Sequence, residues 1–408
     1  MSRTSKLLVG AVALATVAAG CGSSKSTSSG GGGGGSGETI TVGLLGDFTG
    51  LAASGNKTSP LGVQAGISLA AQQGYHIKFV QADTESSPSG ALSAAQTLVE
   101  QDHVSAVLAV SSLTLLAAPY LKKQGIPVIG VAEDGSEWIG DTNMFSVYGF
   151  LDSTKVSTTG GAFFKMEGVT SVGAVGYGIS PQSANSAKAT GVSAQAAGLQ
   201  VGYIDSNFAF GSTNVQPVAI AMKDHGVNGV VSETDPNTSF SLITAMRQAG
   251  DNPKVALFPD GYGGDISQAG PGALQTGQGV FFSLSFEPVE MQTTATKQFQ
   301  TALSAAGVNG DPTYGEYAGY ASVALLVAGL KTAGANPSHA ALISALNGVT
   351  NFDAWGLLGS HTLSMADRNS TAIGVDGCLY VVRLSGSTFQ LVSGADPICG
   401  TEIPGKSV

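Results

Sequence analysis

The chain of 408 residues is long enough for two domains with ordinary hydrophobic cores. Hydrophobic residues make up 43% of it and charged residues only 11%, which is typical of a packed globular protein and excludes a disordered one. The formal net charge of −10 argues against nucleic acid as a partner and against docking on anionic lipid, because both need clustered Lys and Arg.

Residues 1–20 have the parts of an export signal. Arg3 and Lys6 precede an apolar run that is too short to span a bilayer well, and small residues follow directly before Cys21. This arrangement resembles the lipobox of bacterial lipoproteins, in which the cysteine is acylated; a plain secretory signal with an incidental cysteine is the alternative. Residues 21–37 are almost wholly Gly and Ser, as in a flexible tether. The sequence thus predicts a protein that acyl chains anchor to the membrane outside the cytoplasm.

Two further cysteines, Cys378 and Cys399, lie near the C-terminus. Outside the cytoplasm an even pair predicts a disulfide, and two free buried thiols are the alternative. The bridge would clamp a β-hairpin that we expect over 379–392.

From Thr39 onward, short apolar strands alternate with helices. We first expect strands at 39–45, 76–81, 104–110 and 126–131, with helices at 60–73, 89–101 and 113–124. After a transition near Asp152, we expect strands at 171–177, 200–204, 229–232, 254–258 and 279–286, with helices at 182–198, 215–225 and 239–248. Further helices are expected at 294–306, 314–333 and 338–346. The alternation predicts an α/β fold with two doubly wound parallel sheets.

No catalytic or metal-binding motif is complete in the sequence. Residues 400–407 match the pattern of a phosphate-binding loop, but Pro404 lies inside it and only Val408 follows, so the required helix is missing. A nucleophile elbow and a zinc-protease signature are absent, and the five histidines have no ligand spacing. The sequence therefore predicts no enzyme, no metal site and no cofactor.

Polar side chains follow several predicted strands at their carboxyl ends, where ligands bind in open parallel sheets. Ser111, Ser112 and Thr114 stand between a strand and a helix, whose N-terminal N–H groups suit an anion; ordinary helix capping is the alternative. Glu133 follows the next strand, and Asp260 follows a strand of the second sheet. A carboxylate in a closing cleft needs a partner such as a ligand ammonium, unless these acids cap turns or face solvent.

The order of these segments resembles the branched-chain amino acid binding proteins of ABC transporters. The matching stretches are Ile-Thr-Val-Gly-Leu-Leu-Gly-Asp-Phe-Thr-Gly over 40–50, Ser-Ser-Leu-Thr over 111–114, Gly-Ile-Pro-Val-Ile over 125–129 and Pro-Asp-Gly over 259–261. The resemblance covers 39–389. It implies the type I periplasmic binding protein fold, in which two α/β lobes joined by three crossovers close on a ligand. Lobe I would comprise 38–152 with 285–355, and lobe II 153–284 with 356–408.

The resemblance implies roles for matching residues. Ser111, with Ser112 and Thr114 beside it, would hold a ligand carboxylate by its hydroxyl and N–H. Ala132 would offer its carbonyl to the ligand ammonium, and Asp260 would pair with that ammonium.

Three further positions would complete the site around the ligand. Ser54 would lie beside the ligand side chain, whereas Tyr177 and Gln182 would approach from the second lobe. The chain departs from the family at Glu133, where amino acid binders usually have Thr. A second acid disfavours a simple aliphatic amino acid and favours a more cationic or polar ligand, or an acid kept protonated by burial.

These features predict a monomeric, extracytoplasmic solute-binding protein without catalysis. It would capture an amino acid or a related amine or carboxylate and deliver it to the membrane permease of an ABC importer. A ligand sensor for a membrane receptor kinase is an alternative. An exported α/β hydrolase is a third hypothesis, although no histidine is expected at a strand end near Ser111.

Overall fold

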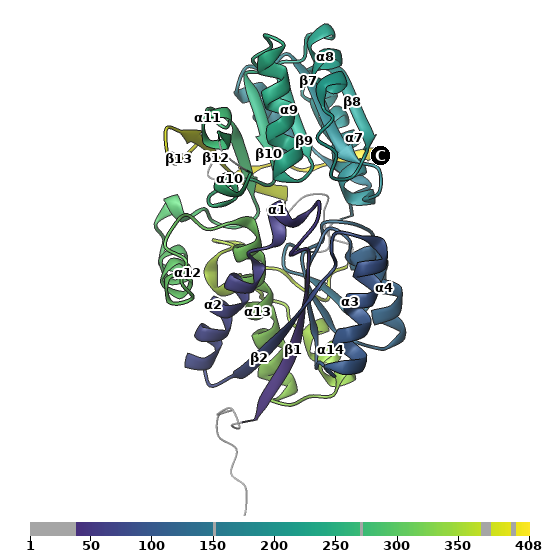
Figure 1. Cartoon of the computed structure of the whole chain (residues 1–408), viewed down its shortest axis with the longest axis vertical. Coiled ribbons are helices and arrows are strands. Elements are labelled where there is room, and N and C mark those ends of the chain that lie inside the picture. The colour runs from purple at the N-terminus through teal and green to yellow at the C-terminus, as the bar shows by residue number, and fades with distance from the viewer. Residues whose placement is uncertain (1–37, 150–151, 270–271, 369–376, 393–396) are drawn as a thin grey trace, which may run out of the picture. The chain divides into compact units, whose positions relative to one another are not determined.

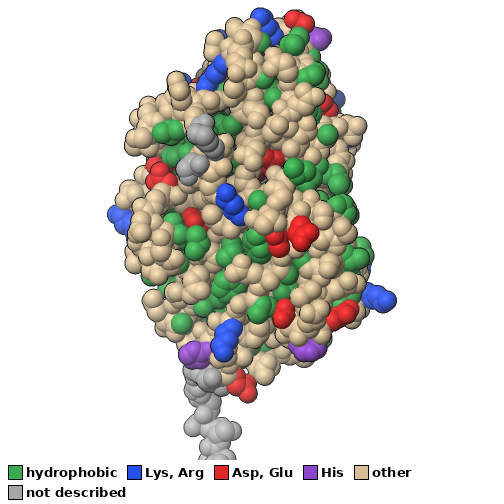
Figure 2. Space-filling view, viewed as in Figure 1, with side chains coloured by type: hydrophobic (Ala, Val, Ile, Leu, Met, Phe, Trp, Pro, Cys, Tyr) green, Lys and Arg blue, Asp and Glu red, His purple; other side chains and the backbone are tan. Residues whose placement is uncertain are grey.

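The computed structural model describes the chain outside residues 1–37, 150–151, 270–271, 369–376 and 393–396 (Figure 1). Cys21 and the expected signal and tether therefore lie outside the described residues. Within the described part, no helix is long and apolar enough to cross a membrane. Charged side chains are few and scattered on the face that Figure 2 shows.

The first sheet has five parallel strands in the order β2-β1-β3-β4-β5. These strands are β1 (Thr39–Gly46), β2 (His76–Asp83), β3 (Val107–Val110), β4 (Val128–Gly130) and β5 (Met144–Ser146). Because β3 and β4 are buried along their whole length, their sequences are continuous apolar runs rather than alternating ones.

Helices cover both faces of the first sheet. They are α2 (Ser59–Gln72), α3 (Pro88–Gln96), α4 (Thr114–Lys123), α12 (Thr294–Ala305), α13 (Tyr314–Ala333) and α14 (His339–Asn347). Leu108 and Val110 of β3 pack into a core cluster with α2 and α13, whereas Val107 and Ala109 pack with α3 and α4 (Figure 1). The alternation of side chains along a strand thus gives the layered structure that the sequence predicts.

Helices α2 and α13 approach closely because glycines stand at their contact. A Cβ atom on Gly62 would lie 2.1 Å from the carbonyl oxygen of Glu316, and one on Gly319 would lie 2.4 Å from that of Ser59. Gly62→Ala should force the helices apart and lower the free energy of unfolding by about 1–3 kcal/mol. Urea denaturation measures this, with Gly310→Ala as the control because its added Cβ meets nothing within 4 Å. Equal stability of the two variants would contradict the close contact.

The second sheet is larger and mixed, in the order β13-β12-β11-β10-β9-β7-β8, with β14 paired to β12. Its strands are β7 (Ser171–Tyr177), β8 (Gln200–Phe208), β9 (Gly229–Glu233), β10 (Val255–Phe258), β11 (Phe281–Leu284), β12 (Cys378–Ser385), β13 (Thr388–Leu391) and β14 (Ile398–Cys399). Strands β7 to β11 are parallel, as predicted. The expected C-terminal hairpin is confirmed as β12-β13 and adds an antiparallel edge.

The remaining elements are shorter or accompany the second sheet. The helices there are α6 (Thr159–Met166), α7 (Pro181–Ala196), α8 (Gln216–Asp224), α9 (Pro236–Gln248), α10 (Asp265–Gln268) and α11 (Ala273–Thr276). The short elements are α1 (Ala53–Asn56), α5 (Glu137–Gly140), the 3₁₀ turns Val289–Met291 and Ala354–Gly356, β6 (Lys155–Ser157) and β15 (Glu402–Ser407). The helix expected over 89–101 ends as a π-helical turn, Thr97–Gln101, which the sequence pattern does not reveal.

The chain passes between the two sheets three times. It leaves the first sheet after β5, returns to it after β11 with α12, and joins the second sheet again at β12. The third passage was expected near Trp355. However, the guanidinium of Arg368 donates to the carbonyls of Asp141 and Met144, both at 3.1 Å, beside the first sheet. These bonds hold the chain against the first sheet beyond the expected boundary.

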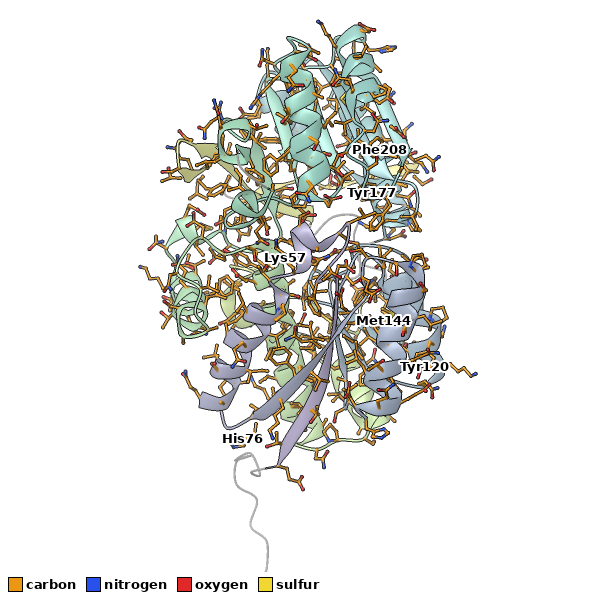
Figure 3. All side chains as sticks on the ribbon, in the orientation of Figure 1. Lys57, His76, Tyr120, Met144, Tyr177 and Phe208 are labelled. Carbon is orange, nitrogen blue, oxygen red and sulfur yellow. A yellow bond between two sulfur atoms is a disulfide. The ribbon has the colours of Figure 1, made fainter. Side chains whose placement is uncertain are left out.

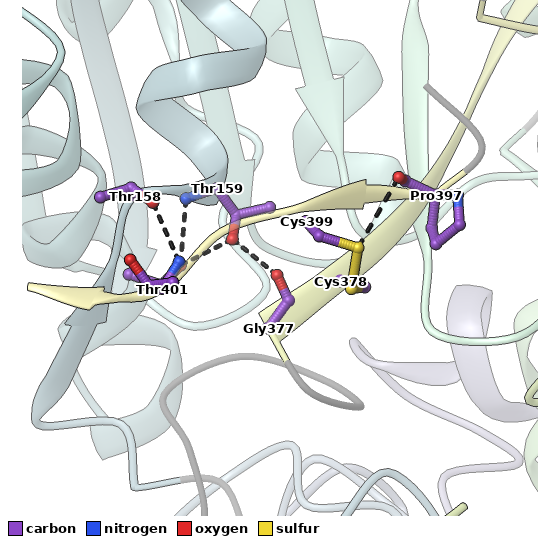
Figure 4. Close-up of a disulfide and its surroundings, with 8 residues drawn as sticks. Thr158, Thr159, Gly377, Cys378, Pro397, Cys399 and Thr401 are labelled. Carbon is purple, nitrogen blue, oxygen red and sulfur yellow. Dashed lines mark hydrogen bonds between the residues drawn. A yellow bond between two sulfur atoms is a disulfide. The ribbon is translucent and has the colours of Figure 1, made fainter. Parts of the chain in front are cut away.

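The predicted disulfide is confirmed. Cys378 and Cys399 are bonded at facing positions of β12 and β14, and together they enclose the β12-β13 hairpin (Figure 4). Next to the bridge, the Thr159 hydroxyl donates to the carbonyl of Gly377 at 2.7 Å. The edge of the second sheet is thereby fixed to the start of α6.

Candidate functional site

A cavity of about 210 Å³ lies where segments from both sheets meet. Its walls include residues that follow the carboxyl ends of β3 and β4 in the first sheet and of β7 and β10 in the second. Tyr314 and Tyr317, at the start of α13, complete the wall. This is the position at which open parallel sheets bind ligands.

Most of the residues expected at the ligand line this cavity. Those that line it are Ser112, Ala132, Glu133, Tyr177, Gln182 and Asp260. Ser54, Ser111 and Thr114 do not belong to its wall and are buried. The Ser54 hydroxyl instead donates to the Asp235 carboxylate at 3.3 Å, and the Thr114 hydroxyl donates to the carbonyl of Ser111 at 3.0 Å.

The anion-binding role expected for Ser111 does not match its hydrogen bonds. The fully buried carboxylate of Asp47 accepts the Ser111 hydroxyl at 2.6 Å and the Ser112 N–H at 2.8 Å. It also accepts the Asn56 side-chain amide at 3.0 Å and the Thr84 hydroxyl. The protein's own carboxylate therefore uses the donors that were expected to hold a ligand carboxylate.

The cavity is lined by four acids, Glu133, Glu233, Asp235 and Asp260, and by no Lys, Arg or His among the described residues. Asp235 is well supplied with donors: it accepts from the Tyr177 hydroxyl and from the Thr238 N–H at 3.2 Å, in addition to Ser54. In contrast, no hydrogen bond to the carboxylates of Asp260 and Glu233 is present among the described residues.

Burial and mutual repulsion raise the pKa values of these acids. Burial and, after it, the negative charge of Asp260 raise the pKa of Glu133 to about 8, although a hydrogen bond from the Tyr314 hydroxyl at 2.8 Å partly opposes the rise. Burial, followed by the charges of Glu233 and Asp235, raises the pKa of Asp260 to about 7. Burial also raises the pKa of Glu233 to about 7. The cavity thus favours a cation, which would reverse these shifts.

Aromatic rings form much of the rest of the wall. The ring of Tyr148 lies 5.2 Å from that of Phe286 and 6.2 Å from that of Tyr314, centroid to centroid. On the side of the second sheet, Tyr177 contacts Phe210 at 5.2 Å and stacks on Phe208 at 6.4 Å, the latter pair being labelled in Figure 3. Acids among aromatic faces suit an organic cation with an apolar body.

Sequence reasoning missed several of these residues. Glu233 and Asp235 follow a strand expected at 229–232. The rule that ligands bind at the carboxyl ends of parallel strands, which identified Asp260, could therefore have identified them as well. Asp47 lies in the stretch 40–50, which resembles the family. Nothing in the sequence there indicates that its side chain is buried. Tyr148 and Tyr314 come from distant segments, and only the fold brings them together.

Two features that catalysis or metal binding would need are not found at this site among the described residues. In the described part of the chain, no group of three or more His, Cys, Asp or Glu residues could hold a metal ion. The hydrolase hypothesis needs a Ser–His pair, yet the Ser111 hydroxyl donates to Asp47 and no described histidine lines the cavity.

A family model described as "Periplasmic binding protein" matches residues 39–388, which is most of the chain. A comparison with curated proteins finds no match.

The fold is similar to that of several solved structures. A leucine binding protein, LivK from Thermotoga maritima, has 17% identity and a TM-score of 0.70, over 87% of this chain and 98% of that chain. LivJ from Streptococcus pneumoniae, in complex with isoleucine, has 19% identity and a TM-score of 0.71, over 90% and 99%. A solute binding protein from R. palustris, in complex with benzoate, has 20% identity and a TM-score of 0.69, over 90% and 98%. At these identities the likeness concerns the fold.

Proposed function

Because the chain belongs to the periplasmic binding protein family of solute-binding proteins, we propose that it captures a small amine-bearing solute, such as an amino acid or a related amine, for an ABC importer. The solute would occupy the cavity between the two sheets, and the loaded protein would dock on a membrane permease. The family consists of solute-binding proteins without catalysis, and the chain is not an enzyme.

The observation that carries this proposal is the unpaired carboxylate of Asp260. It lines the cavity, no described residue donates a hydrogen bond to it, and Glu133 and two further acids share the same space. A half-buried carboxylate that is partly withdrawn from water without a partner carries a free-energy cost. The ammonium group of a ligand would offset that cost, and the aromatic wall would contact the ligand's apolar part.

Closure of the two lobes would hold the solute. The proposed lobes are built on the two sheets, and ligand contacts to Glu133 on one side and Asp260 on the other would favour the closed state. Only such a difference in affinity between open and closed states can shift the equilibrium. A dissociation constant of about 1 μM corresponds to about −8.2 kcal/mol, which one buried ion pair and an apolar contact could supply.

A thermal-shift screen of amino acids, amines, amides and small carboxylates tests the proposal, with calorimetry on each hit. We expect hits among compounds that carry an ammonium group. Hits confined to anions or to uncharged solutes would contradict the role of the acidic cavity.

The proposal includes a lipid anchor at Cys21, which lies outside the described residues. Cys21→Ala should release the protein from the membrane fraction into the soluble extracytoplasmic fraction, because the acylated thiol is lost. Fractionation and labelling with a radioactive or clickable fatty acid measure this. Unchanged membrane association of the variant would show that Cys21 is not the anchor.

A further inference from the structure

The helix N-termini around the cavity are already occupied by acceptors of the protein itself. At α4, the N–H groups of Ser112 and Leu115 donate to the carboxylates of Asp47 and Asp134. At α9, the first turn is capped by Asp235. The helix ends that would ordinarily receive a ligand carboxylate are therefore neutralised from within.

At two further helices that line the cavity, an N–H group of the first turn is also bonded within the protein. At α7, the Ser183 N–H donates to the Ser180 hydroxyl at 3.1 Å. At α13, the Tyr314 N–H donates to the buried carboxylate of Asp265 at 2.9 Å. A carboxylate brought by a ligand would meet no lining cation among the described residues, but four acids.

The cavity also holds an acceptor that lacks a donor. The side-chain amide nitrogen of Asn56 donates to Asp47 at 3.0 Å, which fixes the orientation of the amide. Its Oδ1 atom is buried and has no hydrogen-bond partner among the described residues, and Asn56 lines the cavity. A buried oxygen without a donor is costly, and a ligand N–H could satisfy it.

The acids lie on both sides of the cavity. Glu133 follows β4 of the first sheet, whereas Glu233 ends β9 and Asp260 follows β10 of the second sheet. No described cation lines the cavity to neutralise them. Burial raises the pKa of Asp265, and the charge of the exposed Lys57 (Figure 3) opposes that rise only in part. One ligand charge would leave part of this negative charge uncompensated.

We propose that the cavity binds a small aliphatic diamine that carries no carboxylate, with one ammonium group between Glu133 and Asp260 and the other at Glu233. This inference rests on the proposed function, since it names the solute class of the same site. Unpaired carboxylates and Asn56 Oδ1 accept hydrogen bonds, so primary ammonium groups fit better than quaternary ones. The aromatic wall would contact the methylene chain.

Calorimetry on the full chain in detergent solution tests this with three matched probes. The probes are 1,4-diaminobutane, ornithine, which adds one carboxylate to it, and butylamine, which lacks one ammonium group. We expect 1,4-diaminobutane to bind at least tenfold more tightly than either of the others. Ornithine or butylamine binding as tightly as the diamine would overturn the inference.

The outcomes also separate this inference from the proposed function. If none of the three probes binds but another amine-bearing solute does, the diamine inference is overturned and the solute-binding proposal stands. If no amine-bearing solute binds at all, both are overturned.

A variant locates the second ammonium group. Glu233→Gln should weaken 1,4-diaminobutane at least tenfold and weaken butylamine by a clearly smaller factor, because butylamine has no second ammonium group to pair with Glu233. Asp224→Asn removes the same charge at an exposed position of α8 and should change neither. Equal losses for both ligands, or no loss for the diamine, would overturn the assignment of Glu233. Should Glu233→Gln fail to fold, Glu133→Gln tests the carboxylate on the opposite wall. It should weaken 1,4-diaminobutane, and an unchanged affinity would overturn the inference.

Discussion

Asp260→Asn is expected to weaken the binding of an amine-bearing solute by well over tenfold. The substitution keeps the shape of the side chain but removes the charge that would pair with the ligand ammonium in a cavity where the side chain is half-buried. Calorimetry with the best hit of the thermal-shift screen measures the loss.

Two controls make this result specific. Asp224→Asn should leave the affinity unchanged, since Asp224 is exposed and does not line the cavity. The thermal stability of unliganded Asp260→Asn should not fall, because the native carboxylate has no described donor and is repelled by Glu233 and Asp235. An unchanged affinity in Asp260→Asn would show that Asp260 is not the counter-ion.

Asp47→Ala is expected to have the largest effect on stability. Its removal leaves the Ser111 and Thr84 hydroxyls, the Ser112 N–H and the Asn56 amide without their acceptor. Losing one partner of a buried charged network costs about 3–5 kcal/mol.

Urea denaturation compares this variant with Asp102→Ala. Asp102 is exposed at the end of a π-helical turn, and its replacement should change the free energy of unfolding by less than about 0.5 kcal/mol. Similar denaturation midpoints for the two variants would mean that the Asp47 network contributes little to the fold.

The fold could be predicted from the sequence because periodicity is local. Buried strands such as β3 appear as short apolar runs, and the alternation of strands and helices follows from their spacing. The boundaries were less accurate: a strand expected over 104–110 begins at Val107. The third passage between the sheets was placed near Trp355, although the tertiary hydrogen bonds of Arg368 keep the chain on the first sheet for longer.

The site could be predicted only in part. The rule that ligands bind at strand ends found Glu133 and Asp260, which line the cavity. It could not show that Asp47 takes the donors of Ser111, because that contact joins residues 64 positions apart. Local sequence patterns show which side chains reach an edge of a sheet, but not which of them bond to each other there.

Proton release on ligand binding tests the acidic cavity most directly. In the unliganded protein, the raised pKa values of about 8 for Glu133 and about 7 for Asp260 and Glu233 leave these acids partly protonated near neutral pH. A bound cation lowers their pKa values, so protons leave as the ligand binds and the affinity rises with pH between about 6 and 8. Calorimetry of the best amine hit at pH 7, in buffers of different ionisation enthalpy, counts these protons. We predict a net release of protons. A net uptake would contradict a cation held by these carboxylates. So would the absence of proton exchange together with an affinity that does not vary with pH.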